Sequence, residues 1–192
     1  MPRRKRSSAP GSSLISIFGS LGNFAMRFDD LDNLEHDPKL AAAIGNMVVA
    51  WARAETVLAN TYALVLGIHY NKIVEAYYVI PTFEARIKTL IALLSQWSED
   101  EEKKAQIKSA IEKLSKLAGT RNGWIHGLWC SETKSDTTYV MNVRKPEGGR
   151  HKPVTAHDVD NHSTTVRART QELATIIDLK VLPLRPLPQK SP

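Results

Sequence analysis

The seven residues from Arg121 to Gly127, Arg-Asn-Gly-Trp-Ile-His-Gly, combine side chains that could act on a phosphate group. Arginine binds a phosphate through two parallel hydrogen bonds and offsets the charge that builds on its non-bridging oxygens. Histidine has an ordinary pKa of about 6.5, so it can withdraw the proton of a ribose 2′-hydroxyl or return one to the leaving oxygen. Arg121 and His126 could therefore cleave RNA without a metal, through 2′-oxygen attack that leaves a cyclic phosphate.

The spacing of these residues limits how they could work together. Asn122 and His126 are four residues apart, so on a regular helix they lie one above the other and can hydrogen-bond. Arg121 and His126 are five apart, roughly 140° around the helix axis. They reach one phosphate only if the glycines of the segment allow a local distortion, or if a second copy faces the first across a dimer axis. The structural alternative is an Asn-His pair that closes a helix, with Gly127 as its C-cap.

The pattern of apolar residues predicts a bundle of helices. An apolar stripe recurs at alternating steps of four and three between Asp37, which can cap a helix, and Gly67, which can end one. This predicts a long first helix, the usual spine of a bundle. Two shorter helices are expected, one that Asn71 caps and that runs through Ile80, and one that Thr82 caps.

The second half of the chain predicts two more helices and a hairpin. The helix that ends in the seven-residue segment is expected to begin at a capping box of Ser98 and Glu101. Residues 128–144 then alternate in polarity, which predicts a small β-hairpin. Thr155 with Asp158 forms a second capping box for a last helix. The expected fold class is all-α, an antiparallel helical bundle with a small β-hairpin insertion.

Composition divides the chain into three parts. We expect a flexible basic tail over residues 1–28, the helical domain over residues 29–180, and a disordered proline-rich tail over residues 181–192, a possible ligand for a proline-reading partner. The net charge is +6, but four positive charges stand at residues 3–6 and three follow Asp178. The body is therefore nearly neutral, and its overall charge is no argument for nucleic-acid binding.

Several classes of protein are excluded or disfavoured. The chain contains no run of about eighteen apolar residues, so we expect no membrane-spanning helix. The single cysteine, Cys130, can form neither an internal disulfide nor a multi-cysteine metal site, which indicates either a reducing compartment such as the cytoplasm or indifference to redox conditions. His157 and His162 are five residues apart rather than the four of a zinc pair, and no phosphate-loop or dinucleotide motif is present. We therefore expect no metal and no cofactor.

The segment from Arg121 to Gly127 resembles the signature of HEPN domains, small helical bundles whose motif is an arginine, four to six residues and a histidine. Here four residues intervene, Asn122 is the polar residue that commonly follows the arginine, and Gly127 follows the histidine as it often does in that family. The long first helix agrees as well. The resemblance covers about residues 37–180, but only these seven residues are specific. Trp124 within the motif and the added hairpin depart from the family's pattern.

The resemblance implies a metal-independent endoribonuclease of the kind found in toxin-antitoxin, abortive-infection and other defence systems. Such domains usually form homodimers with both motifs lining one cleft, and their partners are RNA and, in some systems, an antitoxin or other protein. Carried over by position, Arg121 and His126 are the catalytic pair and Asn122 orients the histidine. Many members bind RNA or nucleotides, or only assemble, without cutting. A non-catalytic binding or assembly module is therefore the alternative, and a scaffold for a partner protein is a third.

Four further side chains could support such a site. Glu55 lies beside the apolar stripe of the first helix and could pair with Arg121 and position it. An equally good interpretation is a solvated glutamate paired with a neighbouring lysine or arginine. Arg86 and Lys88 could contact an RNA backbone, although an exposed helix face explains both more simply. Trp51 could stack on a base but fits a core position better.

Overall fold

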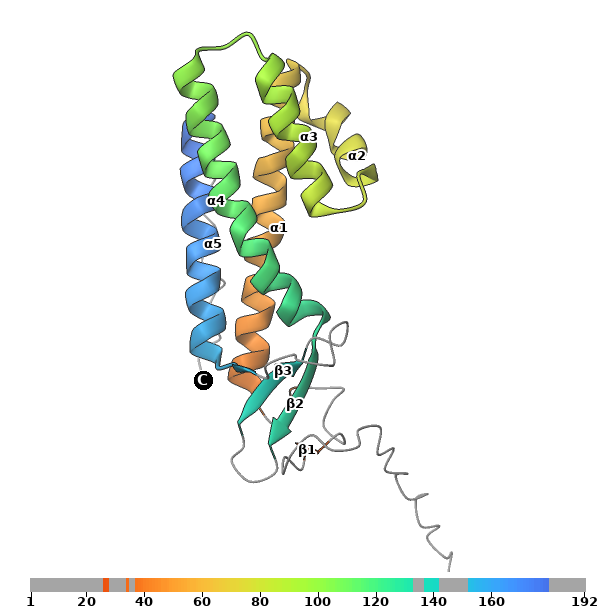
Figure 1. The fold of residues 1–192 in the computed structure, drawn as a ribbon, viewed down its shortest axis with the longest axis vertical. Helices are drawn as coiled ribbons and strands as arrows, with labels where there is room; N and C mark the ends of the chain where they lie inside the picture. The colour runs from red at the N-terminus through yellow and green to blue at the C-terminus, as the bar shows by residue number, and fades with distance from the viewer. Residues whose placement is uncertain (1–25, 28–33, 35–36, 133–136, 142–151, 180–192) are drawn as a thin grey trace, which may run out of the picture.

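Five helices and four short strands make up the part of the chain that the computed structural model describes, residues 26–27, 34, 37–132, 137–141 and 152–179 (Figure 1). The helices are α1 (Pro38–Leu66), α2 (Tyr70–Val79), α3 (Phe83–Gln96), α4 (Glu101–His126) and α5 (Ala156–Ile176). The strands are β1 (Met26–Arg27), β2 (Leu128–Glu132), β3 (Thr138–Met141) and β4 (Lys152–Pro153). The helical fold class with a hairpin insertion is confirmed. Most of the two tails lies outside the described residues.

The long first helix begins and ends where the sequence predicts. The side chain of Asp37 accepts a hydrogen bond from the backbone N–H of Leu40 at 2.9 Å, which satisfies one of the free donors of the first turn of α1. Gly67 ends the helix with a φ of 65°, a left-handed conformation that glycine adopts without a steric penalty. Local signals alone therefore set both ends of α1.

The starts of α3 and α5 are also confirmed. The Thr82 hydroxyl accepts a hydrogen bond from the N–H of Ala85 at 3.1 Å and caps α3. Thr155 and Asp158 form the reciprocal capping box at the start of α5, where each side chain accepts a hydrogen bond from the backbone N–H of the other residue.

Two helix starts differ from the prediction. α2 begins at Tyr70, and its cap is His69 rather than Asn71. α4 begins at Glu101, and its cap is Asp100 rather than Ser98, because the Asp100 carboxylate accepts a hydrogen bond from the N–H of Lys103 at 3.1 Å. An aspartate directly before the first helical residue reaches that donor, which a serine two residues earlier does not.

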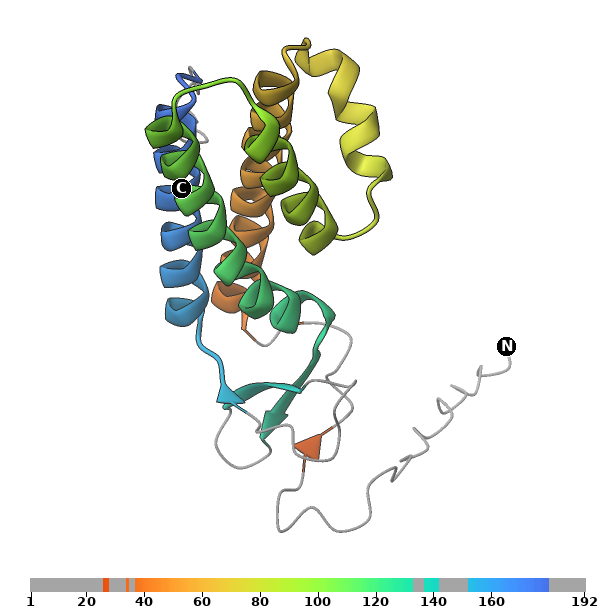
Figure 2. The ribbon, with the colours of Figure 1, turned by 45° about the horizontal axis from the view of Figure 1, so that its top comes forward.

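α1 is the spine of the bundle, and α5 packs along it more extensively than any other element (Figures 1 and 2). The two helices are parallel, with both N-termini at the end of the bundle that carries the sheet, and α4 runs antiparallel to them. α2 and α3 cover only the C-terminal half of α1. The other four helices therefore cover more of α1 near its C-terminus than near its N-terminus.

Two clusters of buried apolar side chains form the core. The larger one joins all five helices and includes Trp51, Leu58, Tyr77, Leu90 and Leu114. The smaller one lies at the sheet end and is built from Leu40, Ala43, Met47, Val154 and Val159. Burying each large aliphatic side chain stabilises the fold by about 1.5–3 kcal/mol. The stripe predicted on α1 supplies residues to both clusters, so this one helix links them.

The predicted hairpin is confirmed and belongs to a larger sheet. β2 pairs with β3 in antiparallel register, with Cys130 opposite Tyr139, and the strand order is β1-β2-β3-β4. Met26–Arg27 and Lys152–Pro153 form the outer strands, although the sequence placed the first in a tail and predicted no strand at the second. Two-residue strands carry no alternation that could reveal them. Cys130 is a buried free thiol, and burial raises its pKa.

Candidate functional site

The Arg121–His126 segment forms the last turns of α4, and the helix continues through it without a break. Gly119 and Gly123 are both helical, and no atom lies within 4 Å of the place that a Cβ would take at either residue. The glycines therefore do not distort the helix, and no local distortion brings Arg121 and His126 together. Gly127 has a φ of −80° and a ψ of 159°, an extended conformation rather than the left-handed one of a glycine C-cap.

Arg121 turns toward α1 and has no acidic partner. Its guanidinium carbon lies 5.7 Å from the centre of the Trp51 ring, and Nη1 donates a hydrogen bond to Oδ1 of Asn122 at 3.0 Å. Its Nε is buried and has no hydrogen-bond partner, and none of the ion pairs within the described residues includes Arg121. A half-buried guanidinium with unused donors is prepared to accept an anion.

His126 lies at the end of α4 with its side chain exposed. Within the described part of the chain, the expected hydrogen bond between Asn122 and this histidine is absent, and the Asn122 side-chain oxygen accepts from Arg121. Asn122 therefore orients the arginine rather than the histidine. No contact joins Arg121 to His126 there, and each faces a different side of the helix, as their spacing of five residues requires.

Glu55 pairs with Arg86 and not with Arg121, which corrects the predicted positioning role. Arg86 Nη1 donates to Glu55 Oε1 at 3.1 Å, and the two side chains are 11% and 20% exposed. The Arg86 Nε also donates to the carbonyl oxygen of Ile80 at 2.9 Å, and the guanidinium carbon lies 4.8 Å from the centre of the Tyr77 ring. These contacts commit Arg86 to the junction of α1, α2 and α3, so it is not free to contact RNA.

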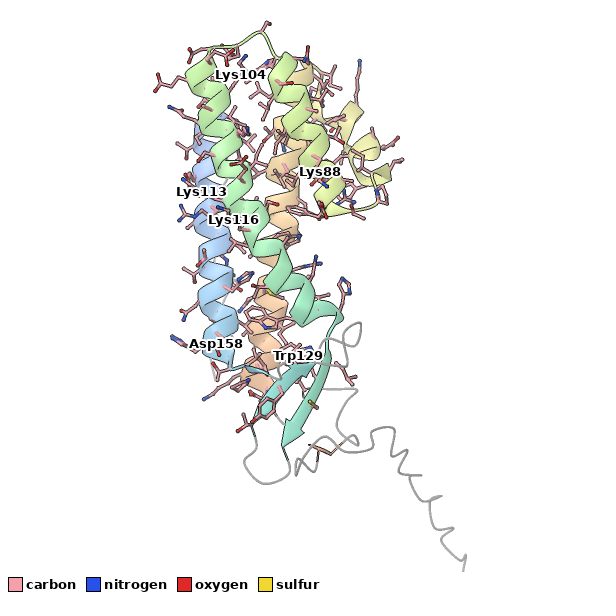
Figure 3. The ribbon with its side chains drawn as sticks, in the orientation of Figure 1. Lys88, Lys104, Lys113, Lys116, Trp129 and Asp158 are labelled. Carbon is pink, nitrogen blue, oxygen red and sulfur yellow. The ribbon has the colours of Figure 1, made fainter. Side chains whose placement is uncertain are left out.

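Lys88 lies on an exposed helix face, the simpler of its two interpretations. It forms an ion pair with Glu84 one turn earlier, and this ion pair lowers the pKa of Glu84. Figure 3 shows Lys88 on α3 and three further lysines along α4, toward the end of the bundle that is remote from Trp129 and the sheet. These four lysines therefore lie away from the end of α4 that carries His126.

Two contacts of aromatic side chains hold the end of α4 in place, and the sequence did not predict either of them. The Trp129 indole Nε1 donates to the carbonyl oxygen of Trp124 at 2.9 Å, which satisfies a carbonyl that the last turn of a helix leaves free. The Trp124 ring also packs edge-on against His162 of α5, with ring centres 5.0 Å apart. His162 Nε2 is buried without a hydrogen-bond partner, and burial lowers its pKa. The only related signal in the sequence was Trp124 itself, whose position within the motif departs from the family's pattern.

No group of three or more histidine, cysteine, aspartate or glutamate side chains within the described ranges is arranged to hold a metal ion. Within the same ranges, no helix has the length and apolar character needed to cross a membrane.

Comparisons with known proteins gave no match: no family model fits the sequence, and neither a curated protein nor a solved structure is significantly similar to the chain.

Proposed function

We propose that this chain is a HEPN-like, metal-independent endoribonuclease of the toxin or defence type, and that it acts in the cytoplasm. The proposal rests on the seven-residue resemblance, and one structural observation supports it best. Arg121 is held against Trp51 and by Asn122, yet it has no carboxylate partner and keeps an unsatisfied buried Nε. A buried donor without a partner costs stability, and this unused donor supports a substrate phosphate as the partner of the guanidinium.

In the proposed reaction Arg121 binds the scissile phosphate and His126 moves the protons. The imidazole of His126 withdraws the proton of the ribose 2′-hydroxyl, and the 2′-oxygen attacks the adjacent phosphorus. The bond from phosphorus to the 5′-oxygen breaks, and the imidazolium of His126 returns a proton to that oxygen as it leaves. The products are a 2′,3′-cyclic phosphate and a 5′-hydroxyl. The exposed position of His126 supports access by a large substrate.

The active unit is a homodimer in this proposal. Arg121 and His126 lie on different sides of one helix and make no contact, so one chain does not bring both to the same phosphate. Two copies related by a two-fold axis present each residue twice at a shared surface. The arginine of one copy and the histidine of the other then flank one RNA strand. An antitoxin or other protein partner would act by covering this surface.

The test is cleavage of a mixed-sequence RNA by the full-length protein in the presence of a metal chelator. We expect products that end in a 2′,3′-cyclic phosphate, and no cleavage of the same sequence made with 2′-deoxyribose. Arg121→Ala and His126→Ala are expected to lower the rate at least 100-fold, which is the range for a positioned acid, base or charge clamp.

Two matched variants control for the loss of an arginine or a histidine as such. Arg167→Ala and His157→Ala remove exposed side chains from α5, outside the motif sequence, and are expected to cleave like the unchanged protein. Circular dichroism of all four variants checks the fold. If purified His126→Ala cleaves as fast as the unchanged protein, the proposed chemistry is wrong.

A non-catalytic RNA-binding, nucleotide-binding or assembly module is the second candidate. It is favoured by the absence, within the described residues, of a hydrogen bond that orients His126. This candidate predicts that Arg121→Ala weakens RNA binding in a gel-shift titration, that His126→Ala leaves binding unchanged, and that no cyclic phosphate forms with any variant.

A further inference from the structure

Phe83, the first residue of α3, is an aromatic side chain that the fold does not fully bury. The apolar stripe of α3 continues from it through Ile87 and Leu90, which are both buried, whereas Phe83 is half-buried. Residues 81–82 before it are exposed, and Val79 at the end of α2 is 80% exposed. A large ligand can therefore reach Phe83 from the side of the connection between α2 and α3.

Phe83 and Arg121 come from different helices and meet at the same indole ring. The ring centres of Phe83 and Trp51 are 4.9 Å apart, with the ring planes tilted by 54°. The guanidinium carbon of Arg121 lies 5.7 Å from the centre of the Trp51 ring. In two views the N-terminal end of α3 lies beside the C-terminal half of α4 (Figures 1 and 2). Trp51 is 3% exposed, so it supports both side chains but offers almost no surface of its own to a ligand.

The carboxylates nearest along the chain to this aromatic pair each have a cationic partner. Glu55 on α1 pairs with Arg86, and Glu84 on α3 pairs with Lys88. Arg121, by contrast, has no carboxylate partner within the described residues and keeps a buried Nε without a hydrogen bond. An uncompensated guanidinium close to a half-buried aromatic ring suits a nucleotide, which carries a phosphate and a base.

We propose that Phe83 stacks on an unpaired base of the RNA strand whose phosphate Arg121 binds. This inference deepens the function proposed above and rests on it. An aromatic side chain stacks on the face of any base, so the contact carries little preference for base identity. A base inside a duplex is covered on both faces by its neighbours and cannot stack on Phe83. The site therefore selects single strands and the unpaired bases of loops.

The test measures binding to a strand that the protein cannot cut. The full chain is titrated by fluorescence anisotropy against a labelled 2′-O-methyl oligoribonucleotide of about ten nucleotides, which lacks the free 2′-hydroxyl that cleavage needs. Phe83→Leu keeps an apolar side chain against Trp51 but removes the stacking surface, and is expected to raise the Kd at least about fivefold. Phe83→Tyr keeps a ring and is expected to bind within about twofold of the unchanged protein.

Trp97→Leu is the matched control. Trp97 is also a half-buried aromatic residue at an end of α3, and its ring centre lies 5.5 Å from Nζ of Lys103, so it too has a cation beside it. It stands at the opposite end of the helix, and its replacement is expected to leave the Kd unchanged. A duplex of the same strand with its complement is the second control. Phe83→Leu is expected not to change duplex binding, because the paired bases are covered.

A cross-link tests the contact in the unchanged protein, so this result does not depend on how Phe83→Leu folds. Irradiation of a bound strand that carries 5-iodouridine joins the base to an aromatic side chain in contact with it, and we expect attachment at Phe83. Attachment at other residues and not at Phe83 would overturn the proposal, as would equal Kd values for Phe83→Leu and Trp97→Leu. A mononucleotide that binds as tightly as the strand would also overturn it, because the ligand would then be a free nucleotide.

These outcomes separate the stacking contact from the proposed chemistry. Binding that depends on Phe83, without cleavage of ordinary RNA, would contradict the chemistry and leave the contact standing. Cleavage that depends on Arg121 and His126 but not on Phe83 would do the reverse.

Discussion

Arg121 donates a hydrogen bond to Asn122 Oδ1 at 3.0 Å, while its buried Nε has no partner. The arginine is thus held in place, but its hydrogen-bonding capacity is not used up, in contrast to Arg86, which pairs with Glu55. The Arg86 ion pair joins α3 to α1, whereas Arg121 keeps a donor that no group within the described residues occupies.

Arg121→Met is expected to leave the free energy of unfolding unchanged or to raise it by about 1 kcal/mol. Methionine keeps the apolar contact with Trp51 and removes a buried donor without a partner, a group that typically costs about 1–3 kcal/mol. Urea titration measures the change, and the same variant is expected to lose RNA cleavage. A fall of more than about 2 kcal/mol would show that Arg121 has a structural role instead.

Arg86→Met is expected to destabilise the protein by about 2–4 kcal/mol, because it leaves the Glu55 carboxylate half-buried and unpaired. The double variant Arg86→Met with Glu55→Gln removes both charges and should recover part of that loss. Urea titration of the two single variants and the double variant gives the coupling energy. Additive losses would contradict the ion pair seen between these side chains.

Stability is expected to fall between pH 7.5 and 5.5 because of His162. Burial lowers the pKa of this histidine in the folded state, so the unfolded chain binds the proton more readily. Above the pKa of about 6.5 that the histidine has in the unfolded chain, both states hold it neutral and the free energy of unfolding does not depend on its protonation. As the pH falls through that value, the unfolded chain binds the proton first, so the free energy of unfolding decreases. The slope for one group is at most about 1.4 kcal/mol per pH unit.

Denaturant titrations at both pH values measure this effect of His162. His162→Phe keeps an aromatic ring against Trp124 and is expected to flatten the dependence. His157→Ala, on the exposed side of the same helix, should leave it unchanged. An equal slope for all three proteins would assign the pH dependence to another group.

Trp129→Phe is expected to loosen the last turn of α4. The substitution keeps the aromatic ring but removes the Nε1 donor that bonds to the Trp124 carbonyl oxygen, which costs about 1 kcal/mol. Hydrogen exchange should become faster at residues 124–127 and stay unchanged in α3. Trp97→Phe is the matched control, because its indole donates no hydrogen bond within the described residues; equal effects of the two variants would show that ring size, not the donor, matters.

Sequence signals that act within a few residues predicted much of the fold. Asp37, Thr82 and the Thr155–Asp158 pair were recognisable as caps because each side chain bonds to a donor two or three residues away. The hairpin was recognisable from alternation along its strands. Ser98 was wrong as a cap because Asp100 competes for the same role two residues later, and only the path of the chain before α4 decides between them.

The candidate site was less predictable, because it depends on contacts between distant elements. Glu55 could be placed beside the stripe of α1, but its choice of Arg86 over Arg121 depends on where α3 packs, 31 residues farther along the chain. His162 could be placed on α5, but not against Trp124. The exposed side of α1 at residues 40–52 could not be predicted either, because an apolar pattern does not show how far neighbouring helices extend along it.

By itself, the sequence determined the helices, most of their ends and the motif from Arg121 to Gly127, because these follow from periodicity and from bonds between near neighbours. The tertiary structure decided which charges pair, which polar atoms are left without a partner, and which side of α1 stays uncovered. These outcomes depend on distances between residues far apart in the chain. Packing of the five helices fixes those distances, and local propensities do not.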